Sequence, residues 1–472
     1  MAEIIINNFQ QGSVDSPFVG FPRFQNLTVT EKTGSLKIQP RLISYLSTNA
    51  LPVAIVKDFV NGSIYTAAGD DLYKGQTDLG LSGSLGTIRD IKVWKNYVWI
   101  ATSTNIEVYG PLDDVGATVP SAVSTGLGSS NPHPMVVGQD DVLYIGDGNN
   151  VVSVSGITEQ PAGTTPTASV NLSALDLPEG EVITALEQYG LWLVAGTQMG
   201  TLYPWDRTSS SFNSPLFIGQ EIFQLRTLNN QLIVQAGNKG ALYVSNLTSY
   251  QLLRNLPINF RTLENTDNKF NALQFYRDEI LYGVGGGGTE LESNFYKGVY
   301  SLDKGALVLR NTISTGADGL STVVKIGSIL PIPDSGSGNL MILVGWQDDS
   351  SYGVDTIHQS GHRYTSYTGL FESPLYQVGD EGTPVTFQDI EFRLSKALES
   401  GEGIRLKYRK DLADDWTTIG TFTSSNITGV THRTNAVIAD AHNVQIRGEL
   451  TTSSSGDAAK ESPELLEIRL RT

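Results

Sequence analysis

The sequence predicts an all-β protein: a seven-bladed β-propeller, with six or eight blades as alternatives, followed by a C-terminal antiparallel β-sandwich. A unit of three short alternating strands joined by polar turns recurs about seven times. Small residues end the second strand in nearly every unit, and after about residue 365 the strands lengthen and alternate strictly. A repeat of roughly 40–50 residues built only from strands is typical of a propeller.

Residues 1–50 are expected to form an extended N-terminal arm. Proline and glycine interrupt its apolar stretch, which disfavours a regular helix. The alternation at Leu36–Ile38 then predicts a strand. We expect this strand to complete the last blade, because closure removes an open sheet edge that would invite aggregation.

Residues 51–365 carry the repeats and are predicted to form the propeller. The third strands are expected to begin near Leu72, Ile106, Val151, Leu202, Leu242, Val299 and Val354. The small residues that follow the second strands are Gly69, Ala101, Gly146, Gly196, Gly237, Gly283 and Gly345. Small side chains are expected where strands crowd towards a common axis.

Residues 366–472 are predicted to form the sandwich. Ile404, Leu406 and Tyr408 alternate with cationic residues, and the segments around 390–394 and 468–471 repeat this pattern. Strict alternation indicates strands with one buried and one solvated face.

Composition excludes several classes of function. The net charge of −17 opposes general nucleic-acid binding, because phosphates would be repelled. The absence of cysteine excludes disulfides and sulfur-based zinc sites. We also expect no signal peptide and no membrane span, since no apolar run is long enough.

No catalytic residue, cofactor or metal site is predicted. The acidic pairs such as Asp140-Asp141 and Asp348-Asp349 lie in turn sequences, where a structural role is favoured. His358 and His362 are four residues apart, but their surroundings do not predict a helix that would bring both onto one ion.

Aromatic side chains are the candidate binding residues. Most should fill the space between neighbouring blades, but a minority near loops could contact a protein partner or a sugar ring. The candidates are Trp205, Trp346, Phe18, Phe21 and Phe24.

Short motifs near both ends resemble those of bacteriophage virion proteins that carry a propeller, including tail nozzle and tail tube proteins of short-tailed phages. The N-terminal motifs are Asn8-Phe9-Gln10-Gln11-Gly12-Ser13-Val14-Asp15-Ser16-Pro17, Asn26-Leu27 and Gly34-Ser35-Leu36-Lys37-Ile38-Gln39-Pro40. The C-terminal motifs are Tyr367-Thr368-Gly369-Leu370-Phe371-Glu372-Ser373-Pro374-Leu375-Tyr376 and Gly403-Ile404-Arg405-Leu406-Lys407-Tyr408-Arg409. The resemblance implies a structural role without catalytic residues.

The expected function is therefore that of a virion structural protein, which acts through its contacts with other virion proteins. We expect it to form a homo-oligomeric ring and to be assembled into the virion in the host cytoplasm. A nozzle or an adaptor-associated protein would fit. One alternative is a carbohydrate-binding adhesin or receptor-binding protein that contacts a host surface glycan. A second alternative is a polysaccharide hydrolase or lyase.

Overall fold

The computed structural model describes residues 3–7, 9, 23–29, 34–113, 121–161, 164–237, 240–255, 271–276, 279–285, 298–303, 306–313, 324–333, 340–357, 361–379 and 383–472. Strands dominate these residues, and the only helix of four or more residues among them is the 3₁₀ turn Asp457–Lys460. The prediction of an all-β protein built from many small antiparallel sheets is confirmed.

Six sheets within the described residues have four strands each. The first three are β6 (Pro52–Lys57), β7 (Ile64–Ala68), β8 (Asp71–Lys74) and β9 (Thr77–Asp78); β10 (Ile88–Trp94), β11 (Tyr97–Thr102), β12 (Asn105–Tyr109) and β13 (Ser121–Thr125); and β14 (Met135–Val137), β15 (Leu143–Asp147), β16 (Asn150–Thr158) and β17 (Thr167–Asp176). The next two are β18 (Ile183–Tyr189), β19 (Trp192–Thr197), β20 (Thr201–Trp205) and β21 (Leu216–Phe217); and β22 (Ile222–Leu228), β23 (Gln231–Ala236), β24 (Ala241–Ser245) and β25 (Tyr250–Arg254). The last is β30 (Val324–Pro333), β31 (Leu340–Asp348), β32 (Ser351–Ile357) and β5 (Leu42–Ser47).

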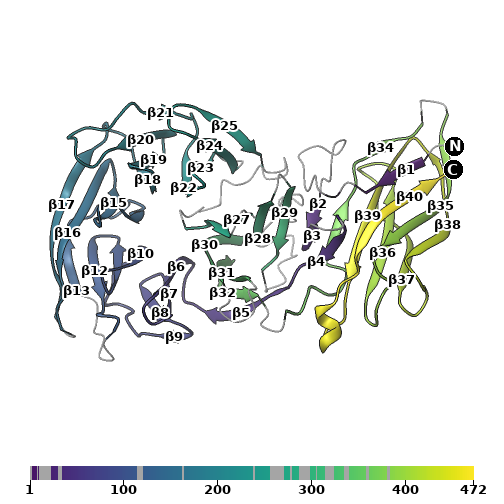
Figure 1. The fold of residues 1–472 in the computed structure, drawn as a ribbon, viewed down its shortest axis with the longest axis horizontal. Coiled ribbons are helices and arrows are strands. Elements are labelled where there is room, and N and C mark those ends of the chain that lie inside the picture. The colour runs from purple at the N-terminus through teal and green to yellow at the C-terminus, as the bar shows by residue number, and fades with distance from the viewer. Residues whose placement is uncertain are drawn as a thin grey trace.

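A further group of four strands begins a ten-stranded sheet. It consists of β26 (Leu273–Tyr276), β27 (Glu279–Val284), β28 (Gly298–Asp303) and β29 (Ala306–Asn311). The first strand of each group contacts the first strand of the next, in the cyclic order β6, β10, β14, β18, β22, β26, β30 and back to β6. The groups thus surround a common centre, in the propeller-like arrangement seen in Figure 1.

Glycines in the C-terminal half of the second strands allow neighbouring groups to approach. A Cβ atom on Gly196 would lie 2.7 Å from Ile222 in the next group, and one on Gly283 would lie 2.3 Å from Ile326. On Gly345 it would lie 2.7 Å from Pro52, where the cycle closes. Larger side chains would therefore force the first strand of the following group away.

Ring closure differs from the sequence prediction. The strand that pairs with β32 is β5 (Leu42–Ser47), in antiparallel register with Leu46 opposite Val354. The expected closing strand, Leu36–Ile38, is instead β4, which pairs with β3 (Leu27–Val29) and touches β40 (Leu465–Arg471). Both Leu36–Ile38 and Leu42–Ser47 have alternating sequences, so periodicity alone could not show which of them closes the ring. Leu36 and Ile38 are instead fully buried in the core of the C-terminal part.

Two sheets share the C-terminal core. One contains β1 (Glu3–Ile6), β3, β4, β35 (Val385–Leu394), β38 (Thr431–Ala441) and β40. The other continues the ten-stranded sheet from β29 through β2 (Arg23–Gln25), β33 (Gly369–Glu372), β39 (Asn443–Thr451), β36 (Gly403–Arg409) and β37 (Thr417–Thr423), with β34 (Tyr376–Gln377) paired to β39. Backbone pairing thus joins the ring to the C-terminal part.

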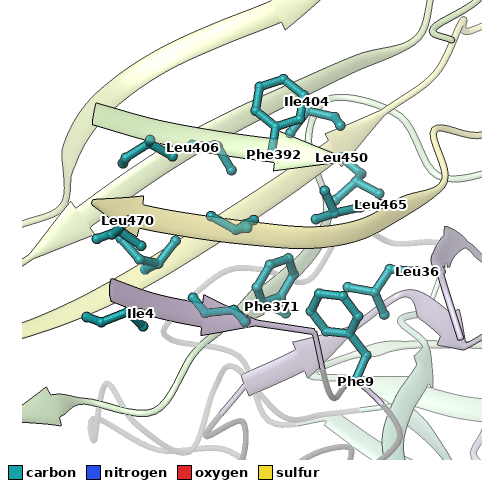
Figure 2. Close-up of a cluster of buried hydrophobic side chains, with 14 of the residues drawn as sticks. Ile4, Phe9, Leu36, Phe371, Phe392, Ile404, Leu406, Leu450, Leu465 and Leu470 are labelled. Carbon is teal, nitrogen blue, oxygen red and sulfur yellow. The ribbon is translucent and has the colours of Figure 1, made fainter. Parts of the chain in front are cut away.

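The described parts of residues 1–50 are not a free arm. Ile4, Phe9 and Leu36 pack into the C-terminal core beside Phe371 and Leu465 (Figure 2). Strand β1 pairs with β40, so the two chain ends lie next to each other (Figure 1). The N-terminal segment therefore contributes to both the C-terminal core and the ring.

Candidate functional site

The described aromatic candidates are buried. Phe24, Trp205 and Trp346 expose 1%, 4% and 5% of their surface, respectively. Phe18 and Phe21 lie outside the described residues. Burial removes these three rings from any surface that a glycan or partner could touch in this structure, and it favours the interpretation of these residues as core fillers.

Packing explains the burial of both tryptophans. Trp205 lies edge-on to Tyr144 of the preceding sheet with ring centroids 5.8 Å apart, and its Nε1 donates to the carbonyl of Ser209 at 2.7 Å. Trp346 lies in a core cluster with Ile326 and Val344. Aromatic rings in such positions fill the wide space between sheets.

The acidic turn residues have local structural partners. Asp141 accepts from Trp94 Nε1 at 2.8 Å and pairs with Lys95. Asp147 accepts from the backbone N–H of Gly128 at 2.9 Å and from the Asn131 amide at 2.6 Å. These contacts favour the turn interpretation.

A group of polar side chains occupies the centre of the ring. We call it the hub cluster, and its members are Asp90, Lys92, Glu187, Arg226 and Asn271. Four of them come from the first strands β10, β18 and β22, and Asn271 lies two residues before β26. The groups that begin with β10 and β26 are not neighbours in the cyclic order, so a contact between them must cross the centre.

Asn271 makes that crossing contact. Its Nδ2 donates to Asp90 Oδ1 at 2.8 Å and to the carbonyl of Val53 in β6 at 3.1 Å. Asp90 is fully buried, and its other oxygen accepts from the backbone N–H of Met135 in β14 at 2.9 Å. Two side chains therefore connect four of the groups around the ring.

The charged members surround the Asn271 carbonyl. Lys92 Nζ lies 3.3 Å from Asn271 Oδ1 and 3.3 Å from Asp90 Oδ2. Arg226 Nη2 lies 3.5 Å from the same Oδ1, and Arg226 Nη1 lies 3.5 Å from Glu187 Oε2. The cluster places an amine, a carboxylate and a guanidinium around one amide group.

Burial shifts two of the ionisation equilibria. Removal from water lowers the pKa of Lys92, although the charge of Asp90 opposes this shift. Removal from water also raises the pKa of Glu187, although Arg226 opposes it. Each shift makes the neutral form of the side chain more populated at a given pH than it would be in water.

Sequence reasoning missed the hub cluster. Asp90 and Lys92 alternate with Ile91 and Val93, which is the pattern of a half-solvated strand. Charged residues in the first strand of three different repeats were the available signal, because first strands approach the axis. No group of three or more His, Cys, Asp or Glu side chains suited to a metal ion occurs in the part of the chain that the structure describes.

Two exposed hairpin tips form a separate feature. Phe59 and Val60, between β6 and β7, expose 89% and 70% of their surface, and Leu191, between β18 and β19, exposes 74%. The buried Asp58 fixes the first tip by accepting from the backbone N–H groups of Val60 and Asn61 at 2.7 and 3.2 Å. Apolar side chains are thus held in solvent by an ordered turn.

Comparisons with known proteins identify no family for this chain. The sequence matches no protein-family model, and no curated protein is detectably similar to it. Among solved structures, the β-propeller domain of Myceliophteria thermophila Cps50 (Swd1) is 14% identical, with a TM-score of 0.44 over 68% of this chain and 100% of that chain. The computationally designed Ika8 protein is 14% identical, with a TM-score of 0.39 over 67% and 99%. Neither is similar enough to inform on function.

Among the residues that the structure describes, no helix has the length and apolar character needed to cross a membrane.

Proposed function

We propose that the chain is a seven-bladed β-propeller followed by a β-sandwich, and that it serves as a structural component of a bacteriophage virion, in the tail or next to it. Support for the blade count comes from the cyclic contacts of the seven first strands. Support for the sandwich comes from the single core that two sheets of residues 366–472 share with the N-terminal strands.

The observation that carries the structural role is the continuous ten-stranded sheet. Strand β2 pairs with β29 of the ring on one side and with β33 of the C-terminal part on the other. Backbone pairing of Gln25 with Leu309 on one side and at three positions of β33 on the other joins the two parts through one sheet, which suits a component that holds its neighbours at fixed positions. The virion assignment itself depends on the N- and C-terminal motifs that resemble those of phage tail proteins.

The exposed hairpin tips are the proposed contacts with a neighbouring virion protein. Phe59 and Leu191 occupy the same turn of their repeats, between the first and second strands. Equivalent turns of a propeller project from the same face, and apolar side chains fixed on one face are typical of protein contact surfaces.

Mass spectrometry of purified virions from the source phage tests the assignment. We expect this polypeptide among the virion proteins, and gold-labelled antibody should place it at the tail by electron microscopy. Virions that lack the polypeptide would refute the proposal.

Substitution of the tips tests the contact surface. Phe59→Ser combined with Leu191→Ser should reduce incorporation into virions while leaving the unfolding of the isolated protein unchanged. Val437→Ser is the matched control, because Val437 exposes 66% of its surface on β38 of the C-terminal part. Equal incorporation of the unaltered protein, the double variant and Val437→Ser would show that the hairpin tips are not the contact with the neighbouring virion protein.

A further inference from the structure

The hub cluster holds the three groups that amide bond formation between side chains requires. A nucleophilic amine, Lys92, and a carboxamide, Asn271, lie side by side with a buried carboxylate, Asp90, in contact with both. The residues come from opposite parts of the ring and are 179 positions apart in the chain. We propose that Lys92 and Asn271 form an isopeptide bond across the centre of the ring.

The electrophile is polarised and fixed. Asn271 Oδ1 lies 3.5 Å from Arg226 Nη2, so the guanidinium charge faces the oxygen on which negative charge would develop, and Lys92 Nζ, the attacking amine, lies 3.3 Å from the same oxygen. The amide nitrogen is held at 2.8 Å by Asp90 Oδ1 and at 3.1 Å by the Val53 carbonyl. The oxygen that gains negative charge therefore faces a cation, and the nitrogen that leaves as ammonia is hydrogen bonded to the carboxylate that would protonate it.

The nucleophile is also prepared. An amine attacks only in its neutral form, and the burial of Lys92 lowers its pKa. Proximity of the two side chains in the folded ring makes the reaction intramolecular, which removes the entropic barrier that an exposed lysine and asparagine would face.

The reaction balances without any further reactant. The lone pair of the neutral Nζ attacks Cγ of Asn271, and the carbonyl π electrons move to Oδ1 beside Arg226. Asp90 takes one proton from Nζ and passes it to Nδ2, to which it is already hydrogen bonded. The Cγ–Nδ2 bond then breaks, ammonia leaves, and an amide joins Nζ to Cγ.

Such a bond would close a covalent loop between the groups that begin with β10 and β26. It would restrict the unfolded chain as a disulfide does, in a protein that has no cysteine. The inference does not depend on the proposed virion role, since it concerns the isolated chain.

Intact-mass spectrometry of the purified, folded and then denatured protein tests the proposal. We expect a mass below that of the sequence by one ammonia, about 17 Da. Trypsin should yield residues 90–95 joined to residues 270–277, because a modified Lys92 is not cleaved. The full sequence mass in the folded protein would overturn the proposal.

Variants separate the bond from a cyclic imide at Asn271, which also loses ammonia. Lys92→Arg keeps the positive charge but should restore the mass expected for its sequence, and Asp90→Asn should do the same because the proton carrier is lost. Lys95→Arg is the control, since Lys95 pairs with Asp141 outside the cluster, and it should retain the deficit. A deficit that persists in Lys92→Arg would overturn the assignment of Lys92.

Discussion

Replacement of Gly196 by alanine tests how the groups pack around the ring. Gly196 is the penultimate residue of the second strand of its group, and Ile222 begins the next group. A Cβ atom at position 196 would lie 2.7 Å from Ile222 Cγ2, well inside ordinary contact distance, and 3.2 Å from Leu225 Cδ1. The backbone of one group must therefore shift relative to the other.

The magnitude follows from two opposing effects. Overpacking a buried contact costs about 1–3 kcal/mol, whereas alanine gains about 0.4–1 kcal/mol over glycine by restricting the unfolded chain. We expect Gly196→Ala to lower the free energy of unfolding by about 1–2 kcal/mol. Ile222→Ala should lower it by about 2–5 kcal/mol, because the fully buried side chain leaves a cavity.

The double variant is the decisive measurement. Ile222→Ala removes the Cγ2 atom that the new methyl group meets, so the double variant should be more stable than the sum of the single effects by about 1–2 kcal/mol. Urea unfolding followed by circular dichroism measures all three. As a control, Gly146→Ala meets Ile183 instead and should combine additively with Ile222→Ala. Additive effects for Gly196 and Ile222, within about 0.5 kcal/mol, would refute the proposed contact.

Three further predictions concern other parts of the chain. Asp58→Ala should lower the free energy of unfolding by about 1–2 kcal/mol in urea titrations, because two backbone N–H groups lose their acceptor; an unchanged value would contradict this role. Burial lowers the pKa of His133 in the folded protein, so the unfolded chain binds the proton at a higher pH, and the free energy of unfolding should fall as the pH drops below about 6.5. The variant His133→Asn, in which asparagine tolerates the positive φ of 54°, should show a weaker fall in acid denaturation curves. An identical fall in the variant would exclude His133 as its source. Phe9→Ala should lower the free energy of unfolding by about 3–5 kcal/mol, since the fully buried ring packs edge-on against Phe371 at 5.3 Å; calorimetry showing less than about 1 kcal/mol would mean that the N-terminal segment is not part of this core.

The repeat itself could be predicted because its signals are local. Asn150–Thr158 contains Val151, near which a third strand was expected, and Leu143–Asp147, which contains the small residue Gly146, is the second strand of the same unit. Asn96 and Asn230 lie in the polar turns between first and second strands and adopt positive φ values of 62° and 60°, which asparagine tolerates in hairpins. These features depend on neighbouring residues, so one sequence suffices to find them.

Long-range pairings could not be predicted in the same way. Leu36–Ile38 and Leu42–Ser47 are both short alternating strands. The partner of Leu42–Ser47 lies more than 300 residues away, whereas Leu36–Ile38 pairs with the nearby β3 and meets the distant β40 only at Leu36. The hub cluster was missed for the same reason: Asp90 and Asn271 meet only because the ring closes. Trp205 and Trp346 resembled loop aromatics in sequence, but the adjoining sheets cover them.

A cryo-electron microscopy map of the isolated protein, at a resolution that separates strands, tests the central claim most directly. We predict seven sheets around one centre, with residues 42–47 as the fourth strand of the last sheet. A different number of sheets, an open arc, or a last sheet completed by another segment would contradict the account.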